Sequence, residues 1–348
     1  MQAWSITLIV IACLIVVYFI YVDIVDAIFL KKTILKRCED HDFALLRYED
    51  VKDEISRTKY RTGYYGKAIN GYVYRDRNIE FCKGFIILSH GFFGTHLQYT
   101  YEIYLLCKAG YKVLAYDQYG CGISEGKNPK SLGNGVYVLE NVIADIKKRG
   151  LNGSLPLILY GHSWGAYCSI AALKHNDDIR CCIARSGPND PILAGMDSLK
   201  RYNKALYYSC YPFLYVINRY ILGRRESVKA TRGLKANHDT RVLALHALDD
   251  TMGSYRHSIA RLAEKNKYEN LTSYVAKHGG HNMFLTLECK NRIKEINAKK
   301  KKIDEIEDED EKKKQTDRLA SSFDRFSIYE CDKDVYRTIM SFIEQSLA

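Results

Sequence analysis

Short runs of consecutive apolar residues alternate along this chain with longer stretches of helical periodicity. The runs that we interpret as buried strands are residues 69–74, 84–89, 111–116, 155–160, 179–184, 242–248 and 271–276. Helical spacing predicts helices over residues 98–108, 136–148, 166–174 and 335–347. Continuous apolar strands separated by helices are typical of a parallel sheet covered on both faces. The pattern therefore predicts an α/β fold with a mostly parallel central sheet.

Two stretches interrupt this alternation. Residues 188–237 form a long insertion between two predicted strands, and the tyrosine-rich run 205–222 within it has helical periodicity. Residues 294–318 hold nine basic and nine acidic side chains in blocks and no aromatic residue, which indicates a solvated helix or a mobile insertion.

The chain is accordingly divided into an anchor, a connector and a core that two insertions interrupt. The predicted boundaries are 1–25 for a transmembrane anchor, 26–65 for a juxtamembrane connector, 66–187 and 238–348 for the core, 188–237 for the first insertion and 291–320 for the charged one.

The anchor is predicted from residues 1–22, which contain no charged side chain. A stretch of this length can span a bilayer as a helix, and Trp4, Tyr18 and Tyr21 lie near its ends, where aromatic residues favour the interface. A cleaved signal peptide is the alternative. It fits less well, because no Lys or Arg precedes the apolar run and no small-residue cleavage pattern follows it.

Basic residues follow the apolar segment and none precedes it. They are Lys31, Lys32, Lys36 and Arg37. The positive-inside rule then predicts a single-pass membrane protein with its body on the cytoplasmic side.

Composition narrows the possible partners. The 348 residues are 47% hydrophobic and carry a formal charge of +11, but the basic residues are scattered, so we expect no nucleic-acid partner.

The eleven cysteines form no CxxC pair and no Cys/His metal spacing. Such usage favours a reducing compartment, and we expect neither a metal nor a cofactor.

The candidate chemistry begins at Gly161-His162-Ser163-Trp164-Gly165, between a predicted strand and a predicted helix. Gly-x-Ser-x-Gly in this context is the sequence form of a nucleophile elbow, a turn so tight that side chains at its flanks would clash. Ser163 is therefore the candidate nucleophile.

A serine hydroxyl needs a base within hydrogen-bond reach, and the base needs an acid to orient it. The order for such a sheet is Ser, then Asp or Glu, then His. We prefer Asp250 as the acid, with Asp249 as the alternative, and His281 as the base, preferred over His278.

Backbone amides must stabilise the oxyanion that forms during acyl transfer. The N–H of Trp164, which follows the nucleophile at a helix N-terminus, is one candidate donor. The N–H of Phe92, in the flexible loop after the strand at 84–89, is the other.

With these motifs in order, the chain resembles an α/β-hydrolase of the branch that contains monoacylglycerol lipases and serine aminopeptidase-like hydrolases. The resemblance rests on His90-Gly91-Phe92-Phe93-Gly94 as the oxyanion loop, on the turn from Asp117 to Ser124, on the elbow, and on Asp250 and His281. Tyr119 stands where the family usually has arginine, and Ala247 replaces a frequent glycine. The resemblance implies that the insertion 188–237 is a helical lid.

These observations predict a membrane-anchored serine hydrolase that cleaves carboxylic, acyl or lipid-like esters. Residues 200–235 carry nine Lys or Arg and few acids, which argues mildly against a lid built to bind a substrate ammonium group. The alternatives are a serine peptidase or amidase on the same fold and a non-catalytic, membrane-tethered interaction module. The natural substrate and the oligomeric state stay open.

Overall fold

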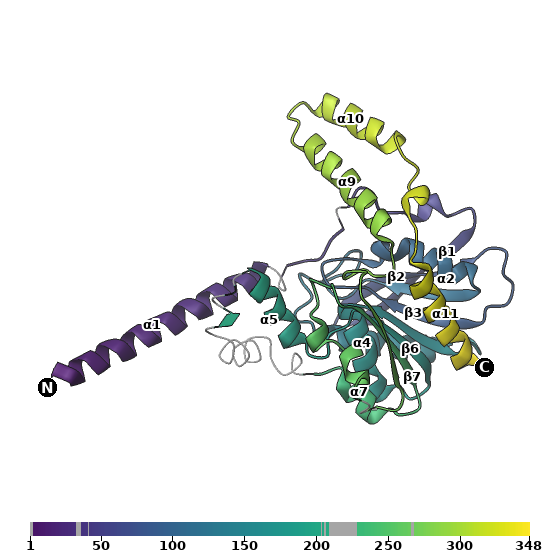
Figure 1. Ribbon diagram of the computed structural model, residues 1–348. Coiled ribbons are helices and arrows are strands. Elements are labelled where there is room, and N and C mark those ends of the chain that lie inside the picture. The colour runs from purple at the N-terminus through teal and green to yellow at the C-terminus, as the bar shows by residue number, and fades with distance from the viewer. Residues whose placement is uncertain are drawn as a thin grey trace.

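An eight-stranded sheet forms the centre of the protein (Figure 1). The computed structural model describes residues 3–32, 36–40, 42–202, 204, 207–208, 228–265 and 268–348. The strand order is β1-β2-β4-β3-β5-β6-β7-β8. β1 and β4 both pair antiparallel with β2, and every later pair is parallel, as the apolar runs predicted. The strands are β1 (Ile55–Tyr64), β2 (Lys67–Asp76), β3 (Gly84–Ser89), β4 (Tyr111–Tyr116), β5 (Leu157–His162), β6 (Ile179–Arg185), β7 (Arg241–Ala247) and β8 (Leu271–Ala276).

Helices cover both faces of this sheet, which confirms the predicted α/β-hydrolase architecture. The helices are α1 (Ala3–Lys32), α2 (Thr100–Lys108), α3 (Asn134–Arg149), α4 (Trp164–Ala172), α5 (Pro191–Tyr202), α7 (Thr231–Ala236), α8 (Ala260–Ala263), α9 (Leu287–Asp304), α10 (Glu309–Ser321) and α11 (Lys333–Leu347). Apolar side chains of α3, α4, α7 and α8 fill the core on one face. Those of α2, α11 and the first half of α9 fill it on the other.

The sheet begins inside the range predicted as a connector. β1 buries Tyr60 and Tyr64 but exposes the charged Arg61 between them. This half-buried alternation is typical of an edge strand. β1 therefore lacks the continuous apolar run from which the other strands were predicted.

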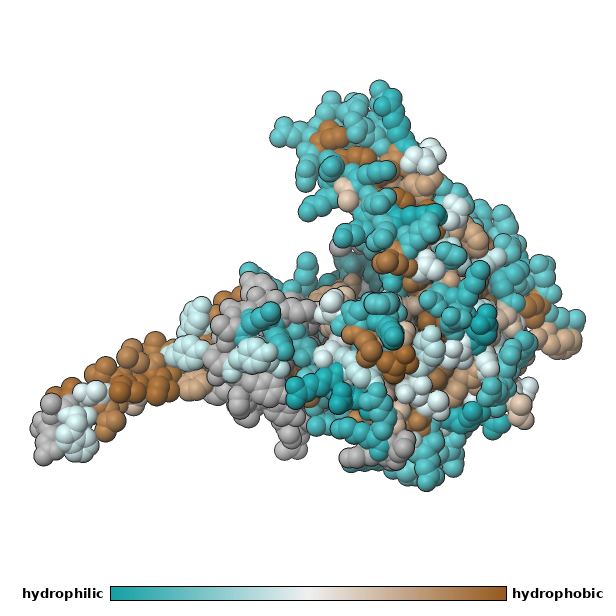
Figure 2. All heavy atoms as spheres, in the orientation of Figure 1, coloured by the Kyte–Doolittle hydropathy of each residue, from teal (hydrophilic) through white to brown (hydrophobic). Residues whose placement is uncertain are grey.

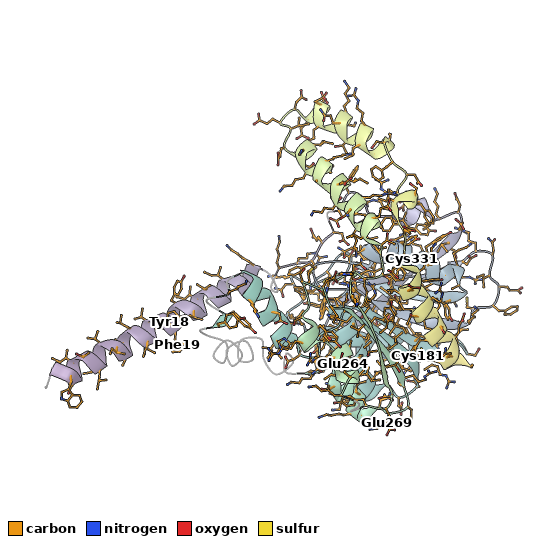
Figure 3. The ribbon with its side chains drawn as sticks, viewed as in Figure 1. Tyr18, Phe19, Cys181, Glu264, Glu269 and Cys331 are labelled. Atoms are coloured by element: carbon orange, nitrogen blue, oxygen red, sulfur yellow. The ribbon has the colours of Figure 1, made fainter. Side chains whose placement is uncertain are left out.

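α1 extends away from the body as a long apolar helix (Figures 1 and 2). Its stretch Trp4–Val22 has a mean hydropathy of 2.8, and only 6% of the apolar window is buried. Tyr18 and Phe19 project from it far from the sheet (Figure 3). By length and composition α1 could cross a membrane or serve as a signal sequence.

The charged insertion forms a helical hairpin. α9 and α10 project away from the sheet, and their surface is mostly hydrophilic (Figures 1 and 2). Within residues 291–320 its buried side chains are Ile296, Ile303 and Leu319. Residues 188–237 include α5 and α7, but most of the run 205–222 lies outside the described residues.

Candidate active site

The predicted elbow is present between β5 and α4. Ser163 has φ 54° and ψ −115°, a conformation that costs an ordinary residue energy and is found mainly at functional sites. A Cβ on Gly165 would lie 1.9 Å from the Ser89 carbonyl oxygen, and one on Gly161 would lie 2.4 Å from the Gly165 backbone. Only glycine therefore lets α4 approach the strands closely enough to form this turn.

Asp250 and His281 come together beyond the ends of β7 and β8. His281 Nδ1 lies 2.8 Å from Asp250 Oδ2, while Asp250 Oδ1 accepts hydrogen bonds from the N–H groups of Met252 at 2.7 Å and Gly253 at 2.8 Å. Burial alone would raise the pKa of Asp250, but its hydrogen bond to His281 and the other donors hold that pKa below its ordinary value. The carboxylate is therefore ionised and can orient the imidazole.

The alternative pair lies at the surface. Asp249 accepts hydrogen bonds from the N–H groups of Gly279 and Gly280, and His278, 3.5 Å from Asp249, has an 89% exposed side chain. This geometry favours Asp250 and His281 over Asp249 and His278.

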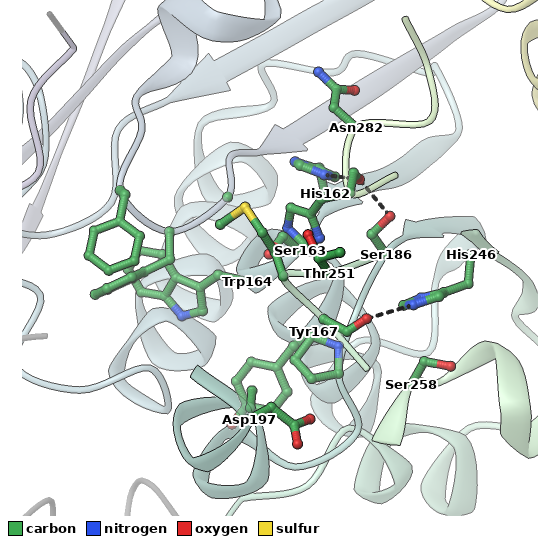
Figure 4. Close-up of a pocket in the computed structure, with 18 of the residues that line it drawn as sticks. His162, Ser163, Trp164, Tyr167, Ser186, Asp197, His246, Thr251, Ser258 and Asn282 are labelled. Atoms are coloured by element: carbon green, nitrogen blue, oxygen red, sulfur yellow. Dashed lines mark hydrogen bonds between the residues drawn. The ribbon is translucent and has the colours of Figure 1, made fainter. Parts of the chain in front are cut away.

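Ser163 and His281 line one cavity of about 820 Å³ (Figure 4). Aromatic side chains dominate one part of its wall, namely Phe92, Phe93, Tyr99, Trp164 and Tyr167. The hydrogen bonds of the described residues include none from the Ser163 hydroxyl. Catalytic hydrogen bonds are often long in a substrate-free enzyme and shorten when the substrate binds. The position of Ser163 and His281 in one cavity is therefore the geometry that supports a reacting pair.

The two residues predicted to supply oxyanion donors, Phe92 and Trp164, line the same cavity as Ser163. Trp164 begins α4, so its N–H is one of the unpaired amides of a helix N-terminus. The Phe92 N–H makes no backbone hydrogen bond within the described part of the chain. Gly91 brings this loop close to the nucleophile, since a Cβ at that position would lie 3.4 Å from Ser163 Cβ.

A hydrogen-bond chain that sequence reasoning missed connects the three loops of the site. The Gly91 N–H donates to Tyr99 Oη at 2.9 Å, and the Tyr99 hydroxyl donates to His162 Nδ1 at 2.7 Å. His162 Nε2 then donates to the His281 carbonyl at 3.0 Å, which also accepts from the Ser186 hydroxyl at 2.8 Å. Burial lowers the pKa of His162 well below its ordinary value, so the ring is neutral and fits this direction of donation.

Asp117 organises the turn that follows β4. Its carboxylate accepts from the backbone N–H groups of His96 at 2.7 Å and Ile123 at 2.9 Å. A Cβ on Gly122 would lie 2.1 Å from Asp117 Oδ2, which accounts for a glycine of the turn motif. Although burial opposes it, contact with His96 lowers the pKa of Asp117.

A buried ion pair supports the loop that carries His281. Arg185 Nη2 lies 2.7 and 2.9 Å from the two carboxylate oxygens of Glu102, and Arg185 Nη1 donates to Asn282 Oδ1 at 2.7 Å. Glu102 also accepts from the Tyr160 hydroxyl at 2.5 Å. An arginine at the end of an apolar strand run is a sequence signal for such a pair, because a buried charge needs a partner.

Comparison with known proteins identifies relatives of this fold. Residues 82–232, less than half of the chain, match the family model described as serine aminopeptidase, S33. A proline iminopeptidase of Saccharolobus solfataricus is 31% identical over 105 residues, which are 29% of this chain and 33% of that protein. The match thus spans about a third of the relative's length.

Solved structures share the architecture over most of the chain. An esterase of Pyrococcus furiosus superposes with a TM-score of 0.54 at 18% identity and covers 76% of this chain and 96% of its own. A second crystal form of that esterase gives a TM-score of 0.53 at 18% identity, over 73% of this chain and 94% of its own. With its sheet order and these structural relatives, the chain has the α/β-hydrolase fold.

Proposed function

We propose that the protein is a serine hydrolase that cleaves carboxylic esters of acyl or lipid-like substrates through an acyl-enzyme. The observation that carries the proposal is the cavity shared by Ser163 and His281, with His281 bonded to an ionised Asp250. A serine on a strained turn and an oriented imidazole are the parts that acyl transfer requires.

In the proposed mechanism the Ser163 hydroxyl turns toward His281 Nε2 and attacks the ester carbonyl. His281 takes the proton while Asp250 holds its Nδ1–H and stabilises the imidazolium. The amides of Phe92 and Trp164 bind the oxyanion. His281 then protonates the leaving alcohol, and a water molecule, activated in the same way, releases the acid and restores Ser163. No step needs a metal or a cofactor.

The aromatic wall of the cavity supports an acyl substrate, because such walls bind apolar groups by burial. One observation favours the second candidate, a peptidase or amidase. The Asp197 carboxylate, on α5, also lines the cavity, and it lies 2.9 Å from His257 Nδ1. A carboxylate there could bind a substrate ammonium group, and the matched family model and the proline iminopeptidase belong to peptidases.

One comparison of substrates separates the two candidates. The full chain, solubilised in detergent, is assayed with p-nitrophenyl acyl esters and with aminoacyl p-nitroanilides, beside Ser163→Ala and Asp197→Asn. We expect ester hydrolysis to exceed amide hydrolysis, to vanish in Ser163→Ala and to persist in Asp197→Asn. Preferred cleavage of the anilides, lost in Asp197→Asn, would instead support the peptidase.

We further propose that α1 is a retained anchor with the body on the cytoplasmic side. The exposed apolar surface of Trp4–Val22 and the basic residues that follow it support this topology. Resistance to carbonate extraction, with protease access to the body only from the cytoplasmic side, is the expected result. A mature chain that lacks α1 would contradict it.

A further inference from the structure

The segment 36–40, which we name the strap, joins the end of α1 to the active-site loops. α1 ends at Lys32, and the strap begins four residues later. It was predicted only as part of a connector. In the structure its backbone and side chains bind two loops, namely the oxyanion loop beside Ser163 and the turn that follows β4.

The first half of the strap pairs with the turn that Asp117 organises. Cys38 forms a parallel bridge with Cys121, donating its N–H to the Gly120 carbonyl at 3.1 Å and accepting from the Gly122 N–H at 2.8 Å. The Arg37 guanidinium donates to the carbonyl oxygens of Gly126 at 2.7 Å, Ser124 at 2.9 Å and Gly122. One arginine thus satisfies three carbonyl groups of a single turn.

The second half of the strap binds Thr95, which directly follows the oxyanion loop (residues 90–94). Asp40 Oδ2 accepts from the Thr95 N–H at 3.1 Å and from the Thr95 hydroxyl. Asp40 Oδ1 accepts from Gln98 Nε2 at 2.5 Å, and Gln98 lines the catalytic cavity. Every group that is hydrogen-bonded to the Asp40 carboxylate is a donor. Position 40 therefore needs a side chain that accepts through both of its terminal atoms, as a carboxylate does.

Phe92 therefore lies between two fixed points of one loop. Gly91 is bonded to Tyr99 on one side, and Thr95 is bonded to Asp40 on the other. Phe93, between them, has φ 64°, a conformation that the surrounding contacts must maintain in a residue with a side chain. We therefore expect release of the Thr95 end to let this stretch relax and to move the Phe92 amide.

We propose that Asp40 and Arg37 are positioning residues of the oxyanion hole. Asp40 binds Thr95 directly, and Arg37 holds the turn whose Asp117 accepts from the His96 N–H, beside Thr95. This inference rests on the proposed function, because it assigns the strap to the Phe92 amide of that mechanism. An oxyanion donor acts on the charge that develops in the transition state. Disturbing the strap should therefore lower kcat and leave KM nearly unchanged.

The test uses Asp40→Asn in the full chain in detergent micelles. The substitution keeps the shape of the side chain but replaces one acceptor with a donor that faces other donors. Asp50→Asn is the matched control. Asp50 lies in the same N-terminal region and accepts the Arg47 N–H at 2.8 Å, and none of its hydrogen bonds reaches the oxyanion loop.

We expect Asp40→Asn to lower kcat for a p-nitrophenyl ester by roughly tenfold, since outright loss of an oxyanion donor costs ~10²–10³. KM should stay within about twofold, and inhibition by a trifluoromethyl ketone, which mimics the oxyanion, should weaken by the same factor as kcat. Asp50→Asn should change none of these quantities. If Asp40→Asn does not fold, Arg37→Lys is measured by the same criteria.

An active wild type with full kcat in a folded Asp40→Asn would overturn the inference. Equal losses of kcat in Asp40→Asn and Asp50→Asn would overturn it too, because they indicate general destabilisation. A folded wild type that hydrolyses neither esters nor amides would overturn the proposed function, and the inference with it.

Discussion

Replacing Asp250 by asparagine should disable His281 without moving it. The two carboxylate oxygens have different partners: Oδ1 accepts from two backbone N–H groups at 2.7 and 2.8 Å, and Oδ2 accepts from His281 Nδ1 at 2.8 Å. An asparagine must place its NH₂ group at one of these positions. Backbone amides cannot change from donor to acceptor, whereas a neutral imidazole can exchange tautomers.

The NH₂ group will therefore face His281 Nδ1. That nitrogen must then accept, so the proton moves to Nε2, the atom that should take the proton of Ser163. His246 Nε2, which lies 3.5 Å from Asp250 Oδ2, opposes this orientation only weakly at such a distance. Tautomer errors of this kind lower kcat by about 10⁴, which corresponds to about 5.5 kcal/mol of transition-state stabilisation.

The assay is steady-state ester hydrolysis by wild type, Asp250→Asn and Asp249→Asn, with thermal unfolding to show that each variant is folded. Asp249→Asn, which changes the exposed neighbour, should keep kcat within about tenfold of wild type. The reasoning is refuted if folded Asp250→Asn keeps more than about a tenth of the wild-type kcat. A collapse of kcat in Asp249→Asn alone would instead assign the acid to Asp249.

Three further predictions test the surroundings of the site. Tyr99→Phe leaves two buried polar groups without partners and should cost about 2–5 kcal/mol of unfolding free energy in urea titrations, together with most of kcat. Tyr104→Phe, which removes an exposed hydrogen bond from α2, the helix that follows Tyr99, should change the unfolding free energy and kcat little. Gly165→Ala should lower the free energy of unfolding by about 3 kcal/mol or prevent folding, because its Cβ would lie 1.9 Å from a backbone carbonyl oxygen. In the control Gly63→Ala the new Cβ has no atom within 4 Å, so this variant should melt near the wild-type temperature. Asp117→Asn should have a clearly lower free energy of unfolding than wild type at pH 7. Because the pKa of Asp117 is lowered in the folded protein, this difference should shrink as the pH falls below about 4. A constant difference between pH 7 and pH 3 would contradict the prediction.

The local parts of this site were predictable from sequence because local sterics fix them. Gly161 and Gly165 identify the elbow, since no other residue fits against the neighbouring backbone. Asp250 and His281 follow β7 and β8, and these parallel strands end at one edge of the sheet, which accounts for the proximity of the two side chains. This proximity was therefore predictable once the strands were recognised.

The supporting contacts were not predictable, because they join segments that no periodicity connects. The Tyr99 hydroxyl meets His162 across 63 positions of sequence, and Arg185 meets Glu102 across 83. The strap has no apolar pattern, so its hydrogen bonds to Thr95 and Gly122 leave no trace in hydropathy. Side-chain and backbone hydrogen bonds between distant loops become visible only when the fold brings them together.

The most direct measurement of the central claim is the mass of the full chain after reaction with a fluorophosphonate probe, followed by peptide mapping. A hydroxyl reacts with such a probe when a neighbouring base activates it and an oxyanion site receives the phosphonyl oxygen. We expect one adduct, on Ser163, in the folded wild type, and none in Ser163→Ala or in folded His281→Ala. A folded wild type that stays unmodified, or an adduct that maps to another serine, would contradict the assignment of Ser163 and His281 as the reacting pair.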